Sequence, residues 1–348
     1  MILKEWTDNQ NRVFIDTVQV HEAFSETFLK SRSWQGGMHW KKSKGREYLF
    51  RSIDRFGNGK SLGPRSPETE KIIDEFRKGK QEIRERLAVL RERIAEQARF
   101  CKAAKIHRVP RLVGAILRLL ERENMLGKNV IIAGTHAIFG YEAAAGVFLD
   151  APILATGDLD ILRDTRARLK LAGNRTLRNR GLLGILRKAD RSFEPLRKSG
   201  FRAVNRDGFM VVLIKPEPRR ITQKDPRRMG GKGDMEAAEI RNLQWLLAAP
   251  KFSQVIIGND GYPARMVVPD PRAFALHELW LSEQSDREPV KKQRDRKQGI
   301  AVAEVVIRYL PNYPFKTSEL RMFPKEVVQK AEKQISDAGM PSGFDVEE

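Results

Sequence analysis

The chain has 348 residues, enough for two or three packed regions, and its 65 lysines and arginines outnumber its 45 aspartates and glutamates, giving a formal net charge of +20. This excess predicts a polyanionic partner, nucleic acid or nucleotide phosphate, in preference to a membrane surface, although scattered surface lysines that serve solubility are the alternative. Cys101 is the only cysteine, which excludes an internal disulfide bond.

Residues 1–65 form a basic, aromatic N-terminal region that contains GMHWKKSKGREYLF. Short alternating runs such as EYLFRSI predict a small β-containing or irregular layer. Interleaved basic and aromatic side chains can stack on bases and pair with phosphates, but they can equally form a small core with a solvated rim. The sequence leaves the role of this region open.

Residues 66–108 are predicted to form one long helix. Ser66 can act as the N-cap and Pro67 occupies the first helical position. Apolar residues such as Phe76 and Leu87 then recur at three- and four-residue spacing. This stripe is typical of a packing seam against the body of the protein or of a coiled-coil hairpin.

Residues 109–234 alternate between helical and strand-like segments. RLVGAILRLLERENMLG predicts a helix, NVIIAG a buried strand, THAIFGYEAAAG a helix and GDLDIL a second strand, which is the order of an α/β unit. Further on, LLGILRKADRSFEPLRKSG predicts a helix, and FRAVN with GFMVVLIKP predicts a hairpin that turns at Asp207-Gly208.

The segment EPRRITQKDPRRMGGKGD is basic and glycine-rich, without apolar periodicity, which predicts an exposed loop. It is either a flexible linker or a contact for nucleic acid. The contact residues under the second interpretation are Arg219, Arg220, Arg227 and Arg228.

Residues 235–348 are predicted to be mainly helical. VIIGNDGYPARMVVP predicts a hairpin that turns at Asp260-Gly261. Three helical stretches follow: DPRAFALHELWLSEQ, EPVKKQRDRKQGIAVAEVVIRYL and FPKEVVQKAEKQIS.

The stretch TGDLDIL places Asp158 and Asp160 on one face of a strand, because strand side chains alternate between faces. Two adjacent like charges repel each other, and ionised carboxylates are costly to bury without partners. Mg²⁺ (or Mn²⁺) is the economical partner, since it takes oxygen ligands from carboxylates, water and phosphate. Upstream, Gly134 and Thr135 lie where a strand turns into a helix, and backbone N–H groups there can receive phosphate. The alternative is a polar strand edge beside an ordinary N-cap.

The run IIAGTHAIFGYEAAAG…TGDLDIL resembles the signature of the polymerase-beta-like nucleotidyltransferases, which is a strand, Gly-Ser or Gly-Thr, a helix, and then Asp-hydrophobic-Asp. The chain also resembles a bacterial family of mostly uncharacterised nucleotidyltransferase-fold proteins, from about Gly37 to Leu310. The resemblance implies an α+β fold with a small mixed sheet at its core. It also implies transfer of a nucleoside monophosphate from a nucleoside triphosphate to an acceptor, with RNA as a candidate.

The resemblance further implies residue roles. Gly134 and Thr135 would hold the triphosphate, and Asp158 and Asp160 would be catalytic metal ligands. In the helical stretch KKQRD, Lys292 and Asp295 are one turn apart and look like the family's later Lys/Asp element, which binds phosphate and braces the site.

Two positions depart from the family pattern. The superfamily usually supplies a third carboxylate from a later strand, and the expected position in GFMVVLIKP holds Val212. In HEL, Glu278 stands where a lysine is expected. These departures leave open a weakened module that binds nucleotide or nucleic acid without turnover. A toxin or stress-response enzyme that modifies transfer RNA or a protein is another alternative.

The opening residues MILKEWTDNQNRVF lack the apolar core of a signal peptide. The longest apolar region, 130–155, is interrupted by His136, Glu142 and Asp150 and by glycines, so it does not predict a membrane span. We therefore expect a cytoplasmic protein without a membrane partner.

Overall fold

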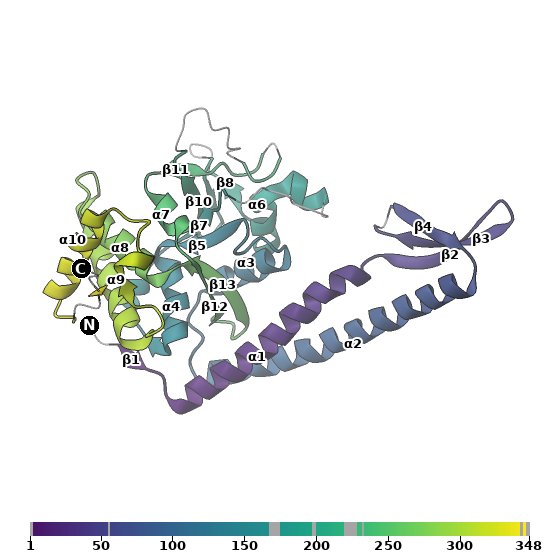
Figure 1. Ribbon diagram of the computed structural model, residues 1–348, viewed down its shortest axis with the longest axis horizontal. Coiled ribbons are helices and arrows are strands. Elements are labelled where there is room, and N and C mark those ends of the chain that lie inside the picture. The colour runs from purple at the N-terminus through teal and green to yellow at the C-terminus, as the bar shows by residue number, and fades with distance from the viewer. Residues whose placement is uncertain are drawn as a thin grey trace. The chain divides into compact units, whose positions relative to one another are not determined.

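The computed structural model describes residues 3–54, 56–166, 175–196, 200–218, 228–231, 233–341 and 344–345. Contacts divide the chain into two compact units, Arg12–Lys105 on the one hand, and Met1–Asn11 with Ile106–Glu348 on the other (Figure 1). The predicted segments 109–234 and 235–348 therefore lie in one unit.

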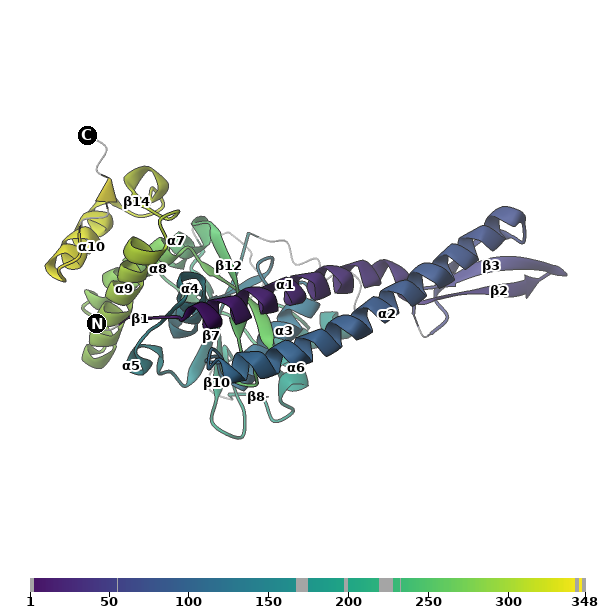
Figure 2. The same cartoon turned by 90° about the horizontal axis from the view of Figure 1, so that it is seen from below.

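The unit Arg12–Lys105 is built on two long helices, α1 (Asp8–Ser31) and α2 (Pro67–Ala103). They run antiparallel, because Thr17 near the start of α1 meets Cys101 near the end of α2, and the two helices lie side by side in Figure 2. Ser66 and Thr69 form the N-terminal capping box of α2. The long helix is thus confirmed, and its apolar stripe is the seam of a helical hairpin.

Helix α1 is an element that the sequence analysis missed. Its buried positions include Thr17, His21 and Thr27, so the apolar period is faint. The hydroxyls of Thr17 and Thr27 donate to backbone carbonyls one turn earlier, Val13 O and Ala23 O, and this lets polar residues lie in the seam.

The only cysteine lies in the same seam. Cys101 is fully buried, and its Sγ is 3.2 Å from Thr17 Oγ1. Burial raises the pKa of the Cys101 thiol.

A three-stranded antiparallel sheet joins the two helices: β2 (Gly37–Ser43), β3 (Arg46–Ser52) and β4 (Gly59–Pro64), with β3 in the centre. One of its faces packs on α2. Leu49 is completely buried there, and the Arg51 guanidinium lies 4.9 Å from the centre of the Phe76 ring. The predicted β-containing layer is therefore confirmed for residues 37–64.

The second unit contains a mixed sheet in the order β5-β7-β10-β9-β8, with β11 also paired to β10. Strand β10 runs parallel to β7, whereas β5 is antiparallel to β7 and β9 is antiparallel to β10. The strands are β5 (Val130–Ala133), β7 (Asp158–Arg163), β8 (Glu194–Pro195), β9 (Arg202–Val204), β10 (Met210–Pro216) and β11 (Ala238–Ile240).

Helices and a second hairpin pack around this sheet. Strand β13 (Pro263–Pro269), paired with β12 (Lys251–Ile257), lies against β5 and against α3 (Arg111–Arg122). Helix α4 (Ile138–Ala145) lies against β12. Both predicted hairpins are confirmed.

Two structural findings correct the sequence analysis of residues 175–234. Helix α6 (Arg175–Ala189) does not continue to residue 200, because Glu194–Pro195 forms strand β8. The predicted exposed loop is also wrong at its end, where Met229 and Asp234 are buried. The Asp234 carboxylate accepts hydrogen bonds from the N–H groups of Gly230 (2.8 Å) and Leu183 (2.9 Å).

The three predicted C-terminal helices are present as α8 (Pro271–Ser282), α9 (Pro289–Tyr309) and α10 (Lys325–Asp337). Helices α8 and α9 approach closely at Gly299, where a Cβ would lie 2.8 Å from Leu279 Cγ. Helix α9 also contacts α4 and α5 (Ala151–Leu154), which brings it to the edge of the mixed sheet.

The remaining elements are short: β1 (Lys4–Glu5), η1 (Arg32–Trp34), η2 (Gly134–Ala137), β6 (Val147–Phe148), α7 (Leu243–Ala248), β14 (Phe315–Lys316), η3 (Thr317–Glu319) and β15 (Phe344–Asp345). Within the described residues, no helix combines the length and hydropathy that crossing a bilayer requires. The fold is a mixed α/β architecture with helices and small sheets, as predicted at that level.

Candidate functional site

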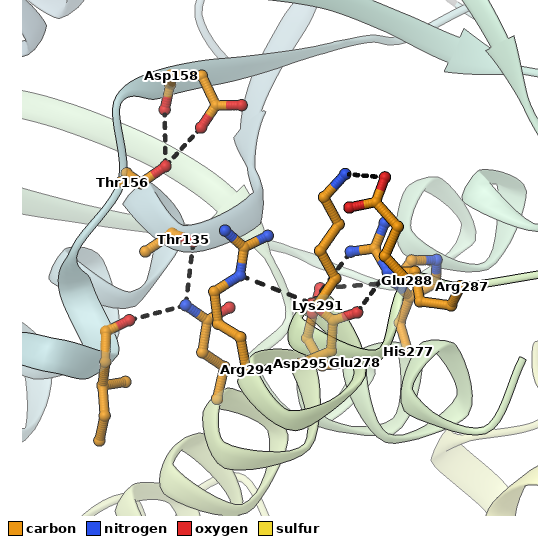
Figure 3. Close-up of polar contacts among 12 residues, drawn as sticks. Thr135, Thr156, Asp158, His277, Glu278, Arg287, Glu288, Lys291, Arg294 and Asp295 are labelled. Atoms are coloured by element: carbon orange, nitrogen blue, oxygen red, sulfur yellow. Dashed lines mark hydrogen bonds and ion pairs between the residues drawn. The ribbon is translucent and has the colours of Figure 1, made fainter.

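The acid pair lies at the start of β7, the strand between β5 and β10. Leu159 and Ile161, which alternate with the acids, are completely buried on the other face. Asp158 and Asp160 therefore share the face that is partly open to solvent. The Thr156 hydroxyl donates a hydrogen bond to the Asp158 carboxylate (Figure 3).

The glycine turn touches this acid pair. Gly134 follows β5 and begins η2 with φ +59°, a left-handed conformation that favours glycine. A Cβ at this position would collide with Asp160 Oδ2 and lie 3.2 Å from its Cγ. The turn continues into η2 and α4, and the Asp160 carboxylate lies close to its backbone at Gly134.

Helix α9 holds the turn from the other side. Gln298, only 2% exposed, donates hydrogen bonds to Thr135 Oγ1 (3.0 Å) and to the carbonyl of Ile153 (2.7 Å). Gln298 is not among the residues that the sequence predicts for the site. The signal for it was its spacing, because Gln298 follows Asp295 by three residues and therefore lies on the same helical face.

Asp295 is buried and engaged by an arginine. Arg287 donates to it through Nε (2.6 Å to Oδ2) and Nη2 (3.0 Å to Oδ1), and Arg294 Nε lies 3.8 Å from Oδ1 (Figure 3). Lys292, its predicted companion, is partly exposed and forms no ion pair with the described residues. The two residues therefore have different environments. Asp295 orients the Arg287 guanidinium, whereas the charge of Lys292 has no acidic partner among the described residues.

The surroundings of Asp160 disfavour the ionised form of its carboxyl group. Desolvation raises its pKa to about 7, and the charges of Asp158 and Glu278 act in the same direction. Arg294 and Arg287 oppose this rise in pKa. Glu278, which the sequence analysis treated only as a missing lysine, is therefore a buried third carboxylate near the acid pair.

His136 does not neutralise the acids. It follows Thr135 in the turn, and burial lowers its pKa to about 4, although the nearby Asp158 charge opposes this. The imidazole is therefore neutral at neutral pH. The His136 side chain therefore adds no positive charge beside the acid pair.

Val212 lies beside Asp160. The register of the parallel strands β7 and β10 pairs Val212 with Asp160 and Met210 with Asp158, so these side chains share one face. On the far side of Val212, the same row continues with Arg202 of β9. The position at which we expected a third acid thus faces the candidate site.

The residues present suit a divalent cation that brings further ligands with it. Asp158 and Asp160 offer carboxylate oxygens beside the glycine turn, and neither forms an ion pair with the described residues. Across the described part of the chain, no three or more His, Cys, Asp or Glu side chains converge as a complete metal cage. Magnesium needs only one or two carboxylates when water and phosphate oxygens complete its shell.

Of the four arginines assigned to nucleic-acid contact, Arg219, Arg220 and Arg227 lie outside the described residues. Arg228 is exposed and forms an ion pair with Glu236.

A family model described as nucleotidyltransferase matches residues 111–323, more than half of the chain. The chain belongs to this nucleotidyltransferase family. The matched range of the nucleotidyltransferase contains the glycine turn, the acid pair, Val212 and Asp295, and it leaves out the whole unit Arg12–Lys105. No curated protein and no solved structure matches the chain.

Proposed function

We propose that the protein transfers a nucleoside monophosphate from a nucleoside triphosphate to an acceptor hydroxyl on RNA, with Mg²⁺ or Mn²⁺, on a polymerase-beta-like core. Family membership supports nucleotidyl transfer in general. The finer proposal is supported mainly by one observation, the contact between the Gly134 turn and the Asp160 carboxylate. Backbone N–H groups at such a turn can receive phosphate, and carboxylate oxygens beside it can bind a metal.

Each part of the site has a role in this proposal. The backbone at Gly134 and Thr135 receives the triphosphate, and Asp158 with Asp160 binds the metal. Arg294, whose side chain is 40% exposed, points from α9 toward the turn in Figure 3 and can pair with phosphate oxygens. The metal, when bound, supplies charge neutralisation for the polyphosphate and the departing pyrophosphate.

The remaining residues have supporting roles in this proposal. Asp295 keeps the Arg287 guanidinium in place, and Lys292 adds a positive charge for phosphate. Arg228, which is exposed, is assigned to the nucleic acid together with Arg219, Arg220 and Arg227. The proposal also places the protein in the cytoplasm, where a single unpaired cysteine is ordinary.

The test is transfer of label from nucleoside triphosphates labelled at the α-phosphate to total RNA or protein, with Mg²⁺ or Mn²⁺. Label should appear on RNA with the wild-type protein and disappear with Asp158→Asn. Triphosphates labelled at the γ-phosphate are the matched control, because that label leaves with pyrophosphate. Label on protein alone would instead identify the protein-modifying alternative. Label on transfer RNA alone would fit the toxin alternative and leave nucleotidyl transfer intact.

The second candidate function is a module that binds nucleotide without turnover. It is favoured by Val212, which occupies the position beside Asp160 where a third carboxylate is expected. This candidate predicts that calorimetry detects metal-dependent uptake of nucleotide while no acceptor receives label. Absence of both uptake and transfer would reject both candidates.

A further inference from the structure

Among the described residues of the unit Arg12–Lys105, no helix packs on one face of its sheet. The face that contains Leu49 and Arg51 packs on α2. Because strand side chains alternate, the other face carries the residues in between. We call it the open face; it comprises His39, Lys41, Arg46, Tyr48 and Phe50.

The open face presents aromatic rings side by side. His39 and Phe50 are cross-strand partners with ring centres 5.6 Å apart, and Lys41 pairs with Tyr48 in the next row. A Cβ at Gly59 would lie 2.7 Å from Phe50 Cε1, so the glycine lets the Phe50 ring lie against strand β4. His39 is exposed, and Tyr48 and Phe50 are partly exposed.

The sheet carries an excess of positive charge, and only part of that charge is paired with acidic side chains. Residues 37–65 contain eight lysines and arginines but two acidic residues. Arg65, next to the covered face, is neutralised by Glu47 and Glu70. Lys41 and Arg46 on the open face are exposed and form no ion pair with the described residues.

We propose that the open face binds single-stranded nucleic acid, with bases stacked on the aromatic rings and phosphates paired with Lys41 and Arg46. Such surfaces combine aromatic platforms, which accept any base, with positive charge that follows the backbone. Lys41, whose Nζ lies 5.4 Å from the centre of the Phe50 ring, and Arg46 have no acidic partner among the described residues. This favours a polyanion, and the adjacent rings favour one that carries bases. This role goes beyond the proposed transfer reaction, since it assigns a function to a unit outside the matched family range.

The experiment measures binding of fluorescent oligonucleotides of about 16 nucleotides to the full chain by fluorescence anisotropy. RNA and DNA single strands are compared with a duplex of the same length and with inorganic polyphosphate, a polyanion without bases. Single strands should bind at least about 10-fold more tightly than either competitor, given the contribution of stacking. Preference for RNA or for DNA then identifies which strand the open face takes.

Two sets of variants locate the binding surface. Tyr48→Leu with Phe50→Leu keeps apolar volume but removes the rings, and it should weaken binding of single strands about 10-fold or more. Lys41→Gln should lower the slope of log affinity against log salt by about 0.7. Lys42→Gln is the matched control, because Lys42 is an exposed lysine on the same strand but on the opposite face, and its slope should stay at the wild-type value.

Unchanged affinity in the double leucine variant, with its fold verified by circular dichroism, would overturn the proposal. Equal slopes for Lys41→Gln and Lys42→Gln would also overturn it, as would polyphosphate binding as tightly as RNA. Asp158→Asn should keep the affinity for single strands, and the leucine variant should keep metal-dependent nucleotide uptake. Failure of the open face is therefore distinguishable from failure of the transfer reaction.

Discussion

Gly134 links the backbone of the turn to the chemistry of the acid pair. Its positive φ and the collision of any Cβ with Asp160 leave no room for a side chain. We expect Gly134→Ala to lower transfer activity by about 100-fold, the scale of effect that a misplacement of about 1 Å produces. The measurement is the rate of label transfer, with the metal-dependent affinity for nucleotide as a second readout.

Gly157 provides the control for that substitution. It lies next to Asp158, its φ is not positive, and a Cβ there meets nothing within 4 Å. Gly157→Ala should therefore retain wild-type activity and affinity. Equal losses in the two alanine variants would show that the space at Gly134 is not the cause.

A substitution at Val212 tests whether the position beside Asp160 can hold a third metal-binding carboxylate. A carboxylate at this position would add a negative oxygen ligand beside Asp160, so Val212→Asp should raise metal-dependent activity and tighten metal binding. Val212→Asn has nearly the same size without the charge and should not do so. If calorimetry gives the same metal affinity for both variants, the third-carboxylate interpretation of this position is wrong.

Glu142 makes the stability of the protein depend on pH. Burial raises its pKa to about 7 from 4.5, although Arg108 and the N–H of Leu149 act in the opposite direction. The folded state therefore holds the proton more tightly than the unfolded state, and stability falls as the pH rises from about 4.5 to about 7.

Glu142→Gln keeps an acceptor for Leu149 and should remove this part of the pH dependence. We expect its melting temperature to fall less than that of the wild type between about pH 5 and about pH 7.5, measured by calorimetry without added metal. Parallel pH profiles for the two proteins would contradict the assignment.

At the scale of elements, helix α9 links the C-terminal helices to the glycine turn through Gln298. Gln298→Leu removes the hydrogen bonds to Thr135 and to the Ile153 carbonyl, and leaving such a buried carbonyl unsatisfied costs about 1–3 kcal/mol. We expect lower thermal stability and several-fold weaker nucleotide binding. Gln293→Leu, an exposed site on the same helix, should change neither property.

The elements that the sequence predicts correctly are those with a strong local signal. The capping residues of α2, the β-branched run of β5 and the Asp-Gly turns each fix structure within a few residues. Helix α1 is not predicted because threonine and histidine occupy its seam, and β8 because two residues are too few to show alternation. A local sequence pattern does not show how the rest of the fold accommodates such residues.

In the candidate site, too, local sequence patterns predict some contacts and do not predict others. The contact of the Gly134 turn with Asp160 was predictable from a glycine turn followed by an acidic strand. The place of Glu278 near the acids was not, because it depends on how α8 packs against residues more than a hundred positions earlier. Likewise, the hold of Arg287 on Asp295 requires the turn before α9, which no spacing rule predicts.

At the scale of the whole molecule, all residues of the proposed transfer site lie in the unit that contains Ile106–Glu348. A ligand stabilises the structure that it binds. We therefore expect Mn²⁺ with a non-hydrolysable nucleotide to slow hydrogen–deuterium exchange in peptides from residues 130–163 and 287–298. Peptides from residues 37–64 should respond instead to single-stranded oligonucleotide. The reverse pattern, measured by mass spectrometry on the full chain, would contradict both site assignments.

The burial of Cys101 against Thr17 has a practical consequence. Its thiol is shielded by the helical seam, and its raised pKa leaves little of the reactive thiolate at neutral pH. We therefore expect the natural chain to react only slowly with maleimide reagents. A cysteine introduced at an exposed position would be the one point of attachment for a dye or spin label, without any background substitution.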